Sequence, residues 1–188
     1  MISLPSSTSP LKTTSRLPPG PVIVFIVLYV CLIGFLVASA PSLPERVASH
    51  FNGHGRANGW MSRSGYLFFI GILPLALGAI LMAAGWLTKS LPAELINVPR
   101  RDFWLAPGRR ALLSAFLMRW VGWLACLITG FIGGLHGMTV AANRVQPPQL
   151  DARSLMGFTL SFVVLLLIWV VAFLLRLANP KAQSGDRV

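Results

Sequence analysis

Residues 50–60, with the sequence HFNGHGRANGW, form the most concentrated group of side chains in this chain that could bind a ligand or a metal. Together with His136, the imidazoles of His50 and His54 would be a sufficient donor set for zinc or copper. However, a spacing of four aligns two histidines only on a helix, which Gly53 and Gly55 disfavour. We therefore expect His50 to be a hydrogen-bonded structural residue and expect no metal site. A metal site and an external pH sensor are the alternatives.

Catalysis is not indicated elsewhere in the chain. The acidic residues are Glu45, Glu94, Asp102, Asp151 and Asp186, and they suggest no carboxylate pair for acid–base chemistry. The sequence also has no glycine-rich phosphate loop and no recognisable nucleophile motif. We expect a protein that is not an enzyme and uses no cofactor.

The composition places these residues in a membrane protein. Of 188 residues only 11% are charged and 55% are hydrophobic, whereas a soluble domain carries about a quarter charged residues. The net charge of +11 has no basic helix or aromatic-basic module around it, so we expect anionic lipid headgroups as the partner and no nucleic acid. Cys31 and Cys126 both fall in apolar runs and are expected to be packing residues.

Four apolar segments are long enough to span a bilayer, since a spanning helix needs about 20 residues. They cover residues 22–40, 65–87, 112–136 and 155–175, and the connectors between them are too short to be domains. We predict an all-α integral membrane protein with a four-helix domain at 21–177, an outer loop at 41–64 and a cytoplasmic loop at 88–111. The Ser-, Thr- and Pro-rich residues 1–20 are predicted to be a disordered cytoplasmic tail, and residues 178–188 a second cytoplasmic tail.

The distribution of Lys and Arg predicts that both termini are cytoplasmic, in the cytoplasmic membrane of a bacterium. With this orientation the larger group is inside, namely Lys12, Arg16, Lys89, Arg100, Arg101, Arg109, Arg110, Arg176, Lys181 and Arg187. The smaller group, Arg46, Arg56, Arg63, Arg144 and Arg153, is outside. Residues 38–40 also resemble a signal-peptide cleavage site. The length of the first apolar run and the three later spans favour a retained helix.

Glycines predict where the helices approach one another. Gly71, Gly78 and Gly85 recur every seven residues in the second span, and Gly122, Cys126, Gly130 and Gly134 recur every four in the third. We expect close helix contact along both series, which could also support a homo-oligomer. The fourth span has no such face and is expected to be exposed to lipid.

The outer loop resembles the signature of the bacterial membrane family known as domain of unknown function 1648. The matching residues lie between positions 43 and 63 and end in an aromatic residue and a base: Leu43, Pro44, Val47, His50, Phe51, Asn52, Gly55, Asn58, Gly59, Trp60 and Arg63. The cytoplasmic loop is similar to a second motif of many of these proteins, through Asn97, Pro99, Asp102, Phe103, Trp104 and Pro107. Ala48 and Ala57 depart from the pattern, which usually has proline at both places, and Gly108 stands where Glu is expected.

The resemblance implies an SdpI-like membrane protein, a group that includes immunity proteins against secreted toxins that can signal to a repressor. The leading hypothesis is therefore protection against, or sensing of, a membrane-active agent through the outer loop. The alternative is a small-solute or lipid-handling transporter, although no Asp or Glu lies within a span. The arginine-rich cytoplasmic loop is interpreted first as a topology signal and second as a docking surface for a protein partner through Phe103 and Trp104.

Overall fold

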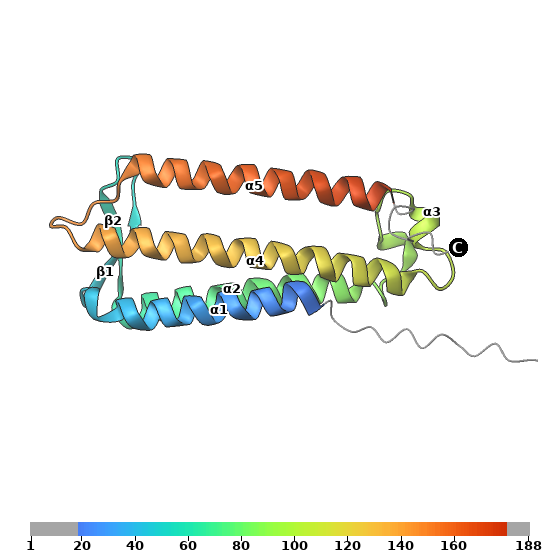
Figure 1. Ribbon diagram of the computed structural model, residues 1–188, viewed down its shortest axis with the longest axis horizontal. Helices are drawn as coiled ribbons and strands as arrows, with labels where there is room; N and C mark the ends of the chain where they lie inside the picture. Colours follow the sequence, from blue (N-terminus) through green and yellow to red (C-terminus); the bar gives the residue numbers. More distant parts are fainter. Residues whose placement is uncertain (1–18, 180–188) are drawn as a thin grey trace, which may run out of the picture.

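Four long apolar helices account for most of the structure, a computed structural model that describes residues 19–179 (Figure 1). They are α1 (Pro19–Ser39), α2 (Arg63–Leu87), α4 (Arg110–Asn143) and α5 (Ala152–Ala178). Each is long and apolar enough to cross a membrane, so the fold is that of a multi-pass membrane protein. The predicted tails fall largely outside the described residues, except that Pro19 and Gly20 already belong to α1 and Ala178 to α5.

The third long helix is longer than predicted. The predicted span ended at residue 136, where the apolar run ends, but α4 continues to Asn143 through residues that tolerate a helix. At about 1.5 Å per residue its 34 residues reach about 51 Å, against a hydrocarbon core of about 30 Å. The additional turns carry α4 beyond the apolar layer to the loop that joins α1 to α2.

The prediction of an all-α protein is wrong for that loop. After a 3-10 turn at Ala40–Ser42, β1 (Arg46–Phe51) and β2 (Ala57–Ser62) form an antiparallel two-stranded sheet. The backbone N–H and C=O groups of this loop are not part of a helix, so they need other hydrogen-bond partners. Pairing two extended segments supplies these partners. The hairpin lies at the end of the bundle where α1 and α4 finish and α2 and α5 begin (Figure 1). We call this the hairpin end, and the opposite end the α3 end.

The glycine series in α2 marks a close helix contact, as predicted. A side chain at Gly71 would meet Leu36 of α1, one at Gly78 would meet Phe25 of α1, and one at Gly85 would meet the backbone of Met118 in α4. Seven residues turn a helix by about 20° less than two full turns, so all three glycines stay near one face. The inner three helices, α1, α2 and α4, therefore pack closely.

The glycine series in α4 does not form one contact face. Gly122 faces Pro21 of α1 and Gly134 faces Phe158 of α5, whereas Gly130 is exposed with open space around it. Four residues overshoot one turn by about 40°, so the series rotates by about 120° from Gly122 to Gly134. Packing at Gly130 was therefore predicted wrongly.

Helix α5 packs on α4 through aromatic rings and is otherwise exposed, in agreement with the prediction for the fourth span. Phe131 stacks on Phe158 and Phe162 with centroid distances of 5.2 and 4.0 Å. Nearer the α3 end, Trp120 contacts Trp169 and Phe173. In its most apolar window none of α5 is buried, and it runs alongside α4 in Figure 1.

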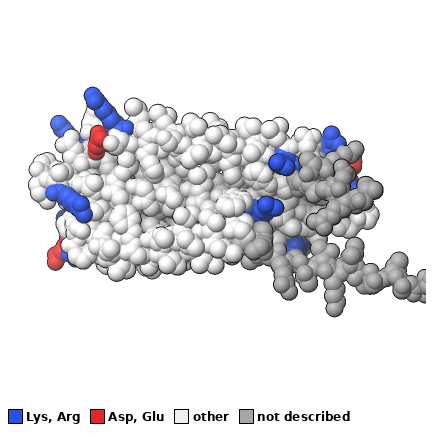
Figure 2. Space-filling model, in the orientation of Figure 1, with Lys and Arg blue, Asp and Glu red and all other residues white. Residues whose placement is uncertain are grey.

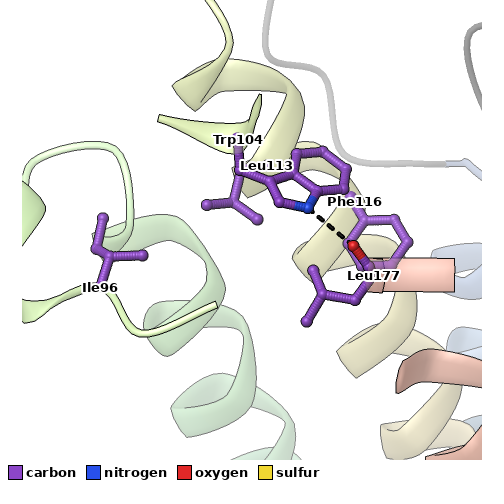
Figure 3. Close-up of a cluster of buried hydrophobic side chains, with 5 residues drawn as sticks. All are labelled: Ile96, Trp104, Leu113, Phe116 and Leu177. Carbon is purple, nitrogen blue, oxygen red and sulfur yellow. Dashed lines mark hydrogen bonds between the residues drawn. The ribbon is translucent and has the colours of Figure 1, made fainter. Parts of the chain in front are cut away.

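The α3 end is closed by a hydrophobic cluster. The connector from α2 to α4 holds a 3-10 turn at Ala93–Leu95 and the short helix α3 (Arg101–Trp104). Figure 3 shows the cluster that these elements form with α4 and α5, made of Ile96, Trp104, Leu113, Phe116 and Leu177. Trp104 Nε1 donates to the carbonyl of Leu177 at 2.9 Å. The loop is thereby attached to the last turn of α5.

Charged side chains gather at the two ends of the bundle. In Figure 2 the visible Lys, Arg, Asp and Glu lie toward the ends, with an uncharged belt between them. Such a belt is what a hydrocarbon layer requires, because a charge at the bilayer centre is costly.

Candidate functional site

The hairpin is seated on the bundle by the apolar residues of its inner face. Leu43, Val47, Tyr66 and Val140 form one buried cluster, joined by the half-buried Met61. Val47 is fully buried, and it pairs with Met61 across the strands. The aliphatic positions of the outer-loop motif therefore fix which face of the hairpin turns inward.

The turn of the hairpin is organised by Asn52 and Gly55. The Asn52 side-chain oxygen accepts from the backbone N–H groups of His54 and Arg56, both at 3.0 Å. Gly55 has a φ of +77°, and a Cβ there would clash with the carbonyl oxygen of Leu150. Leu150 N–H in turn donates to the Gly55 carbonyl at 2.8 Å. Only glycine fits this contact between the hairpin and the α4–α5 connector.

The edge of β1 is closed by one side chain from α4. Asn143 Oδ1 accepts from Ala48 N–H at 2.8 Å, and Asn143 Nδ2 donates to the Ala48 carbonyl at 3.0 Å. The amide therefore makes the same pair of bonds as a neighbouring strand would. A proline at position 48, usual in the pattern that the loop resembles, has no N–H for the first of these bonds. Ala48 allows it.

A buried polar cluster of Ser39, Tyr66 and His136 joins the three inner helices beneath the hairpin. His136 is fully buried, with Nε2 at 2.8 Å from Ser39 Oγ and Nδ1 at 3.0 Å from the Tyr66 hydroxyl. Phe35 contacts the ring edge-on at a centroid distance of 4.8 Å. Both ring nitrogens therefore have a hydroxyl partner from another helix.

The hydrogen bonds of this cluster favour a neutral imidazole. Ser39 Oγ donates to the Leu36 carbonyl at 3.2 Å, which leaves its oxygen to accept from His136 Nε2–H. His136 Nδ1 then accepts from the Tyr66 hydroxyl. A serine beside a histidine is the arrangement of an activated nucleophile. Here, however, the serine proton is directed to a carbonyl and both groups are buried, so the contact is structural.

The three histidines are not brought together. His50 and His54 are exposed on the hairpin, whereas His136 is enclosed by the bundle. Within residues 19–179 no group of three His, Cys, Asp or Glu side chains is placed to hold a metal ion. His50 has one side-chain hydrogen bond, to Ser49 Oγ at 3.2 Å, and its ring lies over Gly59.

The outer face of the hairpin presents an aromatic ring among polar groups. The Trp60 side chain is 47% exposed, and His50, Asn52 and Asn58 are exposed nearby. Asn58 makes no side-chain hydrogen bond within residues 19–179. The remaining members of the motif, Leu43, Pro44, Phe51, Gly59 and Arg63, are buried or half-buried and shape the loop.

The second motif proves to be mainly structural at its centre. Trp104 is only 3% exposed and therefore offers no docking surface, contrary to one of our interpretations. Phe103 is half-buried, with the Arg109 guanidinium 4.1 Å from its ring centroid. The other motif residues lie at the surface, namely Asn97, Pro99, Asp102 and Pro107. Gly108 has a φ of +80°, which explains a glycine where the related pattern has Glu.

A cavity of about 540 Å³ lies at the hairpin end between α4, the α4–α5 connector and the start of α5. Gly137, Ala141 and Leu150 line it, with Gln149, Asp151 and Ser154 as polar residues. Asp151 caps α5. The Ser154 hydroxyl and the Arg153 N–H, which both donate to its carboxylate, hold the pKa of that carboxyl below its ordinary value of 3.8.

Sequence reasoning missed Ser39, Tyr66 and Asn143. A usable signal existed for the first two, because each is a polar residue in an apolar segment at the same depth from the outer loop as His136. Asn143 had no such signal, since it lies beyond the apolar run and was assigned to a connector.

Residues 26–74 match the family model described as Domain of unknown function (DUF1648). The matched part runs from α1 through the hairpin into α2, and it includes the whole outer-loop motif. No curated protein and no solved structure matches the chain.

Proposed function

We propose that this chain, which carries a DUF1648 domain at residues 26–74, presents its hairpin outside the cytoplasm to bind a membrane-active agent, and so protects the cell or senses the agent. The observation that carries the proposal is the contrast between the two faces of the hairpin. One face is fixed to the bundle by buried contacts, and the other exposes Trp60 and His50. A rigid support with an exposed aromatic anchor suits recognition.

The orientation is part of this proposal. The larger group of Lys and Arg favours a cytoplasmic α3 end in a bacterium, with the hairpin facing outward. The resemblance to SdpI-like proteins supports an immunity-like role without catalysis. A cysteine introduced at His54 should react with a membrane-impermeant maleimide in intact cells, and protection of that site until lysis would contradict the orientation.

The test compares survival of cells that lack the protein, carry it, or carry a variant at equal membrane abundance, across a panel of membrane-active peptides and envelope stresses. Trp60→Ala and His50→Ala should lose protection. Trp86→Ala is the matched control, because Trp86 is 57% exposed but lies at the C-terminal end of α2, near the α3 end. Loss of protection with Trp86→Ala and not with Trp60→Ala would place the working surface at the other end.

Handling of a lipid or small solute is the second candidate, and one observation favours it. The cavity between α4 and α5 opens at the hairpin end and combines glycine and alanine walls with the Asp151 carboxylate. Ala141→Trp would fill this cavity from α4, and no hairpin residue lines the cavity. A cellular phenotype that is lost with Ala141→Trp and kept with Trp60→Ala would support this candidate and contradict hairpin recognition.

A further inference from the structure

The two edges of the hairpin are not equivalent. Across an antiparallel pair, residues that exchange backbone hydrogen bonds alternate with residues whose N–H and C=O groups point outward. Ala48 N–H points to Asn143, so the paired residues Ala48 and Trp60 belong to the outward class. The bond from Arg63 N–H to the Glu45 carbonyl, at 2.9 Å, agrees with this assignment. Glu45 and Arg63 lie three residues from Ala48 and Trp60, so the alternation puts them in the hydrogen-bonded class.

It follows that the backbone N–H and C=O of Trp60 point to the outer edge of β2. The sheet has two strands, and the α4–α5 connector pairs with the start of this edge, where Gln149 bridges Arg56. Beyond that bridge, no other strand in residues 19–179 lies along the edge at Trp60. The edge of β1 has its substitute partner in Asn143, whereas Trp60 has none. An unpaired edge of this kind is a template for another extended segment.

The surroundings of this edge indicate what would pair with it. Trp60 is 47% exposed beside the free backbone groups and would cover the side chains of an added strand. Arg56 and Arg63 flank β2. Between the Gln149 bridge and Arg63 the open part of the edge is residues 58–62, which at about 3.3 Å per residue is the length of a five-residue extended segment. Acidic residues near both ends of that segment would meet the two arginines.

We propose that the outer edge of β2 binds an extended peptide with acidic ends by strand addition, with Trp60 as its aromatic anchor. This inference rests on the proposed function and names the chemistry of the agent that the hairpin would recognise. Main-chain bonds to Trp60 supply the attachment, and the two arginines set the preferred position of the peptide.

The test uses the full chain in phosphatidylcholine nanodiscs and a synthetic five-residue peptide of alternating Val and Thr with a Glu at each end. Binding is measured by titration calorimetry, and exchange of the Trp60 amide by NMR. We expect the peptide to slow exchange at Trp60. Trp60→Phe should keep binding, whereas Trp60→Pro, which lacks the outward N–H and has φ fixed at about −65°, should bind at least about fivefold more weakly than Trp60→Ala.

Two N-methylated peptides distinguish strand addition from side-chain contact. Methylation of alternate amides blocks one edge of the peptide, and methylation of the other set blocks the opposite edge. One of the two should bind and the other should not. Equal binding of both, no binding of the unmodified peptide, or slowed exchange only with phosphatidylglycerol nanodiscs would each overturn the proposal.

Failure of this proposal is separable from failure of the proposed function. If the peptide does not bind but Trp60→Ala still loses protection in cells, the hairpin recognises its agent by another contact and the proposed function stands. If the peptide binds in nanodiscs but Trp60→Ala cells survive as well as wild-type cells, the strand-addition site exists and the protective role is wrong.

Discussion

The two ends of this bundle each carry a motif loop with a tryptophan, and the two tryptophans have opposite surroundings. Trp60 at the hairpin end is 47% exposed, whereas Trp104 at the α3 end is 3% exposed and donates to Leu177. The hairpin is joined to the bundle by an apolar cluster around Val47 together with polar contacts from Asn143. The α3 end is joined by a hydrophobic cluster. A shared residue type in two motif loops therefore does not imply a shared role.

The largest expected effect is at the α3 end. Trp104→Ala should lower the free energy of unfolding by about 3–5 kcal/mol, since it empties a buried site. Unfolding can be followed by detergent titration in mixed micelles. Trp86→Ala, on an exposed surface, should change stability by no more than about 0.5 kcal/mol. Equal losses for both variants would mean that Trp104 does not hold this end together.

At the hairpin end, His136→Phe should lower stability by about 2–4 kcal/mol, because two buried hydroxyls lose their partner. His50→Ala is the matched control and should be nearly neutral, since His50 is exposed. The same micelle titration measures both. A larger loss of stability for His50→Ala would mean that His50, and not His136, is the histidine that stabilises this end.

The contact that closes the β1 edge is tested by Asn143→Leu. Loss of both bonds to Ala48 should cost about 2–3 kcal/mol and speed hydrogen exchange at the Ala48 amide. Arg144→Leu, at the exposed neighbouring position, should leave that amide protected. If Ala48 exchanges equally slowly in both variants, the edge is closed by something other than Asn143.

The turn of the hairpin offers a smaller test through its glycines. Gly55→Ala should cost about 1–2 kcal/mol from its positive φ alone, and more if Leu150 has to move. Gly53→Ala, where a Cβ meets open space, should be tolerated. Thermal unfolding of the two variants in one detergent compares them, and similar melting temperatures would show that the turn does not require the left-handed conformation.

The smallest effect is expected at the start of α5, and it depends on pH. Because the folded pKa of Asp151 is lowered, its contribution to stability is present above its ordinary pKa of 3.8 and is lost as pH falls through the folded pKa. Asp151→Ala should therefore lower the melting temperature at neutral pH and have no effect once the pH is well below the folded pKa. Glu45→Ala makes the same charge change at the same end without removing a cap. A pH-independent difference would rule out the carboxylate as its cause.

Much of this architecture could be predicted because hydrophobic length is local information. Four apolar runs of sufficient length predicted four helices, and the seven-residue spacing of Gly71, Gly78 and Gly85 predicted a packed face of α2. The outer-loop motif likewise predicted where a compact loop would lie. The spacing of four in α4 failed as a predictor because it rotates around the helix, and Gly130 is left exposed.

The sequence by itself determined the membrane class, the number of long apolar helices and the position of the motif loops, since each depends on composition or spacing along the chain. Only the tertiary structure decided that the outer loop is a hairpin, that Asn143 completes its edge, and that Ser39 and Tyr66 meet His136. The physical reason is that these groups come from segments far apart in the chain. Their hydrogen bonds exist only after the helices have packed.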